Sequence, residues 1–296
     1  MGEATDRSDA RAHVIDAHVH IWGPDSETYP WDADFGVAVG EPEPVSNLLD
    51  NLESARFTRA LIVQSSVYGC DHRYLVQVLT SYSDRFRGVA LVDPLNPLTP
   101  TLMHDFAEGG MITGIRMTPL RVDRGWFSED AAPIWEAAAQ EGLALTILVG
   151  PQHLEELGRW ARRYSEVKII LDHFACPDIS MGKPPRSING LIGLAEIPNC
   201  HMKMSALGAL SAKSYPFSDM WDLVRRAVDA FGATRILWGS DFPYVQYYGS
   251  SIAESCNAAQ LALGQFSRAE CEAIMGGNTE RIFRFSSHIA SRDTQL

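Results

Sequence analysis

Histidine side chains that could bind a metal ion stand at the end of the first apolar segment of the chain. The segment ends in Asp16-Ala17-His18-Val19-His20. Side chains two residues apart on a strand point to the same side, so His18 and His20 can present their imidazoles together. Two neutral imidazoles held in this way make half of a metal site. The alternative for the pair alone is chance packing near a strand end.

Two more candidates follow later apolar segments. His173 stands in Leu171-Asp172-His173-Phe174, and Asp241 stands in Trp238-Gly239-Ser240-Asp241-Phe242-Pro243. A carboxylate at Asp241 could ligate a metal and take a proton from an attacking water. The structural alternative is that Asp241 caps the next helix and that His173 is a core histidine satisfied by its neighbours. We predict that His18, His20, His173 and Asp241 form one site, catalytic and metal-binding.

Three arginines suggest an anionic substrate. Arg116 ends an apolar segment, and Arg121 and Arg124 follow it in Thr118-Pro119-Leu120-Arg121-Val122-Asp123-Arg124. A guanidinium group matches a carboxylate in two parallel hydrogen bonds, so an arginine cluster would select carboxylated compounds. For Arg121 and Arg124 the alternative is a solvated surface position.

Other polar residues near these segments are predicted to contact the substrate. Lys203, inside an apolar segment, needs an anionic partner, either Asp172 or the substrate. A helix cap at Asp71 would explain the polar composition after the second apolar segment equally well. A tyrosine cluster could line a pocket or serve packing. The predicted substrate contacts of this group are Gln64, Ser66, Lys203 and Tyr244.

Short β-branched, apolar segments alternate with segments of helical periodicity. The predicted strands are Val14–Ala17, Ala60–Gln64, Gly88–Val92, Gly114–Met117, Ala144–Val149, Lys168–Leu171, His201–Ser205 and Arg235–Trp238. The predicted helices are Val45–Ser54, His72–Tyr82, Leu98–Glu108, Ala131–Glu141, Pro151–Arg163, Ile188–Ala195, Phe217–Phe231 and Ser250–Leu263.

This alternation predicts an α/β fold, a (β/α)8 TIM barrel that forms a single domain over residues 1–296. A doubly wound open sheet competes, but no Gly-x-Gly-x-x-Gly follows the first strand. The candidate residues fall at the carboxyl ends of strands, where barrel enzymes carry their active sites. The aromatic loop from Gly23 to Pro44 would form a lid over the barrel or a packed surface loop. Arg268–Phe285 is predicted to be helical and to close the bottom of the barrel, and residues 286–296 to fray.

The composition is that of an ordinary globular protein, with 46% apolar and 21% charged residues. The net charge of −12 argues against binding of nucleic acid phosphates or of an anionic membrane surface. There is no apolar run of the ~20 residues that a membrane span needs, and the amino terminus does not resemble a secretory signal. Five cysteines without Cys-x-x-Cys spacing indicate neither a disulfide framework nor a zinc-thiolate site, so we expect a cytoplasmic protein.

The three strand-end motifs, Asp16–His20, Leu171–Phe174 and Trp238–Pro243, occur in the order typical of the amidohydrolase superfamily, and the chain resembles its amidohydrolase-2 branch over nearly its whole length. Within that branch it is similar to the lactonases, which include 2-pyrone-4,6-dicarboxylate lactonase, 4-sulfomuconolactone hydrolase and sugar lactonases. Val63-Gln64-Ser65-Ser66 and Asp172–Asp178 are close to the lactonase versions of these motifs.

The resemblance implies a catabolic hydrolase that opens a carboxylated lactone, derived from an aromatic compound or a sugar acid. The positions around the metal in relatives are matched here by His18, His20, His173 and Asp241. This implies one divalent ion, with zinc as the first candidate, although some such lactonases work without metal. Gly114-Ile115-Arg116-Met117 offers no lysine for a carboxylated bridge, so a binuclear centre is not expected.

The alternatives within the superfamily are a zinc-dependent non-oxidative decarboxylase and an amide or ester hydrolase. A non-catalytic barrel that binds a carboxylated metabolite is the alternative from another class, but it has little use for three histidines beside Asp241. The expected partner is a small molecule, and a homo-oligomer is left open.

Overall fold

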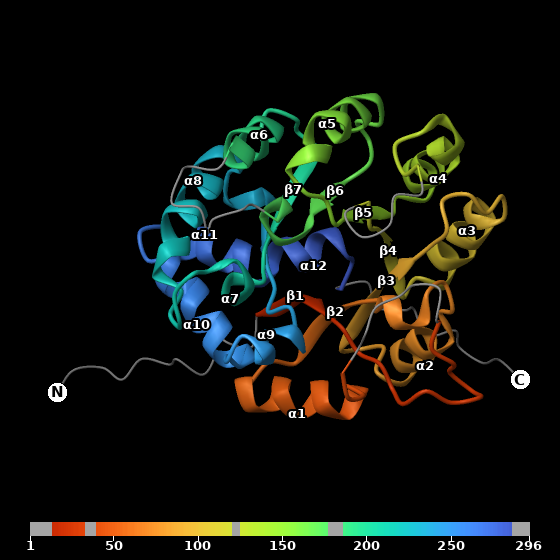
Figure 1. Ribbon diagram of the computed structural model, residues 1–296, viewed down its shortest axis with the longest axis horizontal. Coiled ribbons are helices and arrows are strands. Elements are labelled where there is room, and N and C mark those ends of the chain that lie inside the picture. The colour runs from red at the N-terminus through yellow and green to blue at the C-terminus, as the bar shows by residue number, and fades with distance from the viewer. Residues whose placement is uncertain (1–13, 33–39, 120–124, 177–185, 286–296) are drawn as a thin grey trace, which may run out of the picture.

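The computed structural model describes residues 14–32, 40–119, 125–176 and 186–285. Eight parallel strands lie in the order β1 to β8, each hydrogen-bonded to the next along the chain. They curve round until β8 lies beside β1, with helices outside them (Figure 1). The predicted (β/α)8 barrel is confirmed. The strands are β1 (Ile15–Val19), β2 (Arg59–Val63), β3 (Phe86–Leu91), β4 (Ile112–Met117), β5 (Ala144–Ile147), β6 (Ile169–Leu171), β7 (Cys200–Met204) and β8 (Ile236–Trp238).

The helices that follow the strands agree closely with the predicted segments. They are α1 (Val45–Ala55), α2 (Arg73–Ser81), α3 (Thr99–Gly109), α4 (Ala132–Glu141), α5 (Leu154–Arg163), α6 (Arg186–Leu194), α8 (Trp221–Phe231) and α10 (Ile252–Ala262). Two predicted helices begin instead with separate 3-10 turns, Pro151–His153 and Ser218–Met220. The short helices α7 (Leu207–Leu210) and α9 (Tyr244–Tyr247) were not predicted, because four residues are too few to show helical periodicity.

Alternation along the strands divides the core into two layers. Leu61 and Val63 of β2 belong to a cluster inside the barrel, whereas Ile62 between them packs in the layer under the helices. This is the period of two expected for strands that are buried on both faces. The inner cluster also contains residues of five other strands and of the carboxyl-terminal segment: Ile15, Ala17, Val89, Ala144, Ile170, Leu237, Ile282, Phe283 and Phe285.

The carboxyl-terminal segment closes the amino end of the barrel, as predicted. Phe283 is wholly buried, and the guanidinium of Arg59, the first residue of β2, lies 5.9 Å from the centre of the Phe285 ring. The segment is not one regular helix: α11 (Arg268–Glu272) and α12 (Asn278–Ile282) flank a π-helical turn, Ala273–Gly277. The floor of the barrel is therefore made by aromatic side chains from the end of the chain.

The barrel is closed between β1 and β8 by a few contacts that also place the candidate site. Val19 and Phe242 form an isolated parallel bridge, and the amide of Asp241 donates to the carbonyl oxygen of His18 over 2.9 Å. A Cβ at Gly239 would lie 2.8 Å from the backbone nitrogen of His18, which is closer than a side chain can approach. Glycine at position 239 lets the two strand ends meet.

The described aromatic residues of the loop from Gly23 to Pro44 favour the packed-loop alternative. Tyr29 packs against Tyr74 of α2 with ring centres 5.3 Å apart, and the indole of Trp31 donates to the carbonyl oxygen of Gly23. Phe35 lies outside the described residues. The residues that the structure describes contain no helix long and apolar enough to cross a membrane.

Candidate active site

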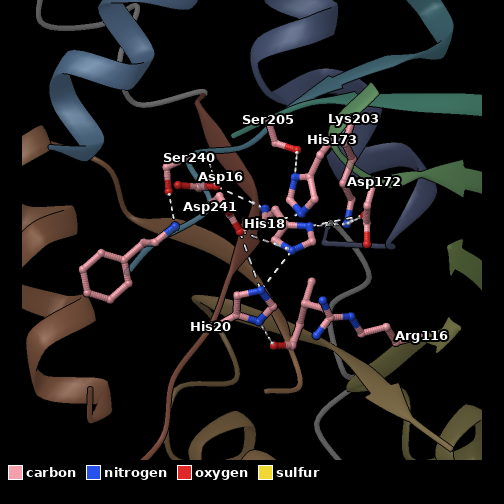
Figure 2. Close-up of polar contacts among 12 residues, drawn as sticks. Asp16, His18, His20, Arg116, Asp172, His173, Lys203, Ser205, Ser240 and Asp241 are labelled. Carbon is pink, nitrogen blue, oxygen red and sulfur yellow. Dashed lines mark hydrogen bonds and ion pairs between the residues drawn. The ribbon is translucent and has the colours of Figure 1, made fainter. Parts of the chain in front are cut away.

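Three imidazoles converge on one carboxylate at the carboxyl ends of the strands. His18 and His20 stand at the end of β1, His173 follows β6, and Asp241 follows β8 (Figure 2). The distance from Asp241 Oδ1 to Nε2 is 3.7 Å for His18, 3.7 Å for His20 and 3.9 Å for His173. The structure thus brings together the four side chains that the strand-end motifs singled out.

Two of the imidazoles are oriented by contacts at Nδ1, which leave Nε2 facing Asp241. His20 Nδ1 lies 2.7 Å from the carbonyl oxygen of Val63. Because a carbonyl oxygen only accepts, His20 carries its proton on Nδ1 and offers a lone pair on Nε2. His173 Nδ1 lies 2.8 Å from Ser205 Oγ, a hydroxyl that can donate or accept.

The third imidazole, His18, is held by a buried ion pair. Its Nδ1 lies 3.1 Å from Lys203 Nζ and 3.3 Å from Asp172 Oδ1, and Lys203 Nζ lies 3.1 Å from the same carboxylate oxygen. Burial raises the pKa of Asp172, but Lys203 and His18 outweigh it and hold that pKa well below its usual range. Of the two partners considered for Lys203, the structure supplies Asp172. Lys203 is wholly buried beside His18 and does not form part of the cavity wall.

Burial sets the protonation of the site. It lowers the pKa of His18 and of His20 well below the ordinary value, so both imidazoles are neutral. It raises the pKa of Asp241 to about 8, against the opposing effect of the Arg116 guanidinium. Among the described residues, no hydrogen-bond donor reaches Asp241 Oδ1, although that atom is buried. Without a cation beside it, Asp241 therefore holds a proton more tightly than an ordinary carboxyl group, and its carboxylate form is a stronger base than usual.

Left-handed backbone conformations turn the chain sharply where the site residues leave the strands. His173, Phe174, Ala175 and Cys176 have φ angles of 49°, 54°, 54° and 47°, and Asp241 has a φ of 66°. Such conformations cost about 1–2 kcal/mol per residue for side chains other than glycine. Through this turn after β6, both His173 and Cys176 reach the cavity.

Asp16, the first residue of the Asp16–His20 motif, had no predicted role, and its side chain links β1 to the segment after β8. Its Oδ1 accepts from the backbone amides of Ser240 over 2.9 Å and of His18 over 3.1 Å (Figure 2). Burial raises the pKa of Asp16 to about 6, although these hydrogen bonds oppose the rise. The first aspartate of the motif therefore supports the backbone on both sides of Asp241. An aspartate two residues before a histidine at a strand end was the only signal of this role.

A cavity of about 330 Å³ opens above these groups. His20, His173 and Asp241 form part of its wall, together with Ser66 and Tyr244, two of the predicted substrate contacts. Arg116, another predicted substrate contact, also lies in the wall, as do Ser65 and Tyr248 from the polar segment after β2 and from the tyrosine cluster. The rest of the wall was not predicted, because small apolar residues outside the long helices and strands look like packing residues in a sequence. It consists of Leu148, Cys176, Ala206, Ala209 and Leu210.

Of the other predicted substrate contacts, Arg116 lies in the wall and Gln64 does not. The guanidinium of Arg116 donates to the carbonyl oxygen of Gln64 over 2.9 Å. The side chain of Gln64 itself donates to the carbonyl oxygens of Gly69 and Asp71, so it braces the loop after β2. Arg121 and Arg124 lie outside the described residues.

The four central groups fit a divalent cation such as zinc. Imidazole nitrogens and carboxylate oxygens are zinc ligands in proteins, and hydrogen bonds at the far nitrogen commonly orient ligating histidines. Ligand atoms of His18, His173 and Asp241 lie within 4.8 Å of one another. The buried Asp241 oxygen that lacks a donor would gain a partner from such an ion.

A family model described as amidohydrolase matches residues 15–285 of the chain. An L-fucono-1,5-lactonase from Burkholderia ambifaria is 30% identical over 278 residues, which cover 91% of this chain and 95% of that protein. A 2-pyrone-4,6-dicarboxylate hydrolase from Comamonas testosteroni is 24% identical over 79% of this chain and 77% of that protein.

Solved structures share the fold. A probable 2-pyrone-4,6-dicarboxylic acid hydrolase from Acinetobacter baumannii, with citric acid bound, superposes with a TM-score of 0.79 at 18% identity, over 92% of this chain and 99% of that one. An amidohydrolase from Burkholderia multivorans with bound zinc gives a TM-score of 0.78 at 20% identity, over the same shares of the two chains.

Proposed function

Because the chain belongs to the amidohydrolase family, we propose that it is a lactonase, which hydrolyses the ring ester of a small carboxylated lactone with Asp241 as the general base. The observation that carries the proposal is the buried Asp241 oxygen, which lacks a donor among the described residues and faces three imidazole nitrogens at the edge of a cavity. The lactonase and hydrolase names of the relatives support the reaction class.

The reaction needs one proton to be moved from water to the leaving group. Asp241 takes a proton from a water in the cavity, and the water oxygen bonds to the lactone carbonyl carbon. The ring C–O bond then breaks, and the proton held on Asp241 passes to the alkoxide oxygen that leaves. Water and lactone become one hydroxy acid, and the carboxylate of Asp241 is regenerated.

One zinc ion would be held by His18, His20, His173 and Asp241, whose donor set suits it. When bound, it supplies Lewis acidity that polarises the lactone carbonyl. The zinc found in the amidohydrolase from Burkholderia multivorans supports this choice of ion. The part of the histidines is to hold this ion beside Asp241, where charge develops as the water attacks.

Arg116 would recognise a carboxylate on the substrate. It lies in the cavity wall, is only 4% exposed, and is fixed through the carbonyl oxygen of Gln64. A guanidinium withdrawn from water binds a carboxylate more strongly than an exposed one. Ser66 and Tyr244 of the same wall would hydrogen-bond the ring oxygens, and Arg121 and Arg124 stay candidates for further carboxylates.

The test is proton release from a panel of pyrone carboxylates, muconolactones and aldonolactones, followed with a pH indicator. Each substrate is run after chelation and after added zinc. Acid formation from a carboxylated lactone at a higher rate than from its methyl ester is the expected result. Release of carbon dioxide would instead identify a decarboxylase, and turnover of amides or open-chain esters alone would contradict the lactone assignment.

A further inference from the structure

Lys203 and Asp172 form a charged pair with no exposed surface beneath the candidate site. Lys203 comes from β7, Asp172 follows β6, and the Nδ1 atom of His18 on β1 completes a triangle with sides of 3.1, 3.1 and 3.3 Å. Figure 2 shows the pair on the far side of the His18 ring from His20. Neither residue is part of the cavity wall, so neither side chain can touch a substrate there.

Its contribution to folding stability does not by itself explain why an ion pair is buried here. Withdrawing an ammonium and a carboxylate from water costs about as much as their attraction returns, and an apolar pair of the same size is often as stable. The contact that distinguishes this pair is the one with His18, because both charged groups meet the same ring nitrogen.

A chain of hydrogen bonds leads from Lys203 through the imidazoles of His18 and His20 to the backbone of β2, and each group in it donates to the next. Lys203 only donates, and the carbonyl oxygen of Val63 at the other end only accepts. His20 therefore carries its proton on Nδ1. The contact of 3.1 Å between the Nε2 atoms of His18 and His20 then requires that His18 donates from Nε2 and accepts from Lys203 at Nδ1.

A cation cannot bind His18 in this tautomer, because Nε2 carries the proton. For Nε2 to offer a lone pair, the proton must appear on Nδ1, where it needs an acceptor. Asp172 Oδ1, 3.3 Å from Nδ1, is that acceptor. The net charge of the imidazole is the same in both tautomers.

We propose that Lys203 and Asp172 are positioning residues that let His18 exchange its tautomer. Lys203 supports the form that donates from Nε2 to His20, and Asp172 supports the form whose Nε2 binds a cation. The inference rests on the proposed function for its cation but adds two residues that touch neither cation nor substrate. The ring stays in place while its donor and acceptor roles change.

The test uses the full chain labelled with ¹⁵N-histidine, in which long-range ¹H–¹⁵N spectra report the tautomer of each ring. His18→Gln assigns the His18 signals by their loss. The variant is the double substitution Lys203→Met with Asp172→Asn, because removing either charge alone leaves the other buried and unpaired. Arg87→Met is the matched control, since Arg87 is also a buried cation of the barrel and contacts the carbonyl oxygens of Ser83 and Phe86 instead.

Without metal, the wild type is expected to show the proton of His18 on Nε2, and added zinc moves it to Nδ1. In the double variant, His18 should no longer be found only with its proton on Nε2. The zinc affinity of this variant should fall by about 10–100-fold, the usual effect of removing a group that orients a ligand. Its kcat falls by a similar factor of about 10–100 while KM changes little, and Arg87→Met leaves the spectrum and the zinc affinity as in wild type.

Two results would overturn the inference: a wild-type His18 that carries its proton on Nδ1 without metal, or a double variant with unchanged His18 signals and zinc affinity. The wild-type spectrum decides even if the double variant does not fold. Failure of the wild type to hydrolyse any lactone would contradict the proposed function alone, because the metal-free tautomer is measured without substrate.

Discussion

His201 makes the stability of the barrel depend on pH, in a direction that follows from its burial. It is the second residue of β7, is only 6% exposed, and has its Nδ1 3.1 Å from the carbonyl oxygen of Asn199. Burial lowers the pKa of His201 from 6.5 to about 4. Between these two values the unfolded chain takes up a proton that the folded chain does not bind, so the free energy of unfolding decreases as the pH falls.

The size of this loss follows from the two pKa values. At about 1.4 kcal/mol for each pH unit, the interval from 6.5 to about 4 corresponds to about 3 kcal/mol. The loss begins as the pH drops below 6.5 and is complete once the pH is below the folded-state value. Above 6.5 the imidazole is neutral in both states and the full stability is present.

The substitution His201→Gln removes the titration and keeps an amide that can donate to the Asn199 carbonyl. Urea unfolding of both proteins, with chelator, is measured at about pH 7 and about pH 4. The wild type is expected to lose about 3 kcal/mol more than the variant, since all other groups titrate equally in both. Equal losses in the two proteins would refute the assignment of a neutral, buried His201.

Three further predictions concern the cavity, the strand junction and the floor of the barrel. Arg116→Met should lower kcat/KM for a carboxylated lactone by about 10–100-fold, the worth of a charged hydrogen bond, with little change for a neutral lactone; equal loss on both substrates would contradict carboxylate recognition. Gly239→Ala should lower the free energy of unfolding by about 1–3 kcal/mol, because the new methyl group would meet the His18 backbone at 2.8 Å. The control Gly109→Ala has no atom within 4 Å of the added carbon, and an equal effect of both substitutions would exclude the steric explanation. Phe283→Ala should cost about 3–5 kcal/mol in urea unfolding by emptying the floor of the barrel, and a loss below about 1 kcal/mol would show that the floor repacks.

Much of the fold could be predicted because it follows from the hydrophobic periodicity of the segments and from their order along the chain. The alternating segments predicted eight strands, and spacing of two residues placed His18 and His20 on one side of β1. The carboxyl ends of parallel strands share one edge, so His173 and Asp241 were expected beside them although about 70 residues separate the two.

What the sequence could not supply depends on contacts between distant loops. Gln64 was expected to face substrate, but its amide instead braces the turn at Gly69 and Asp71. In the apolar wall, Leu210 belongs to α7, which is too short to show a periodic pattern, and nothing in the sequence indicated that Leu148, directly after β5, faces the cavity. The partner of Lys203 was open between two candidates until the registers of β6 and β7 placed Asp172 beside it.

The most direct test of the account compares wild type with Asp241→Asn on the lactone that the panel identifies, at saturating substrate. Asparagine has the shape of aspartate but cannot take a proton, so we predict a fall in kcat of at least about 100-fold. Circular dichroism should show an unchanged fold, and Asp105→Asn, at an exposed carboxylate of α3, should show unchanged turnover. An Asp241→Asn enzyme that turns over at a rate within tenfold of wild type would contradict the role of Asp241 as the base.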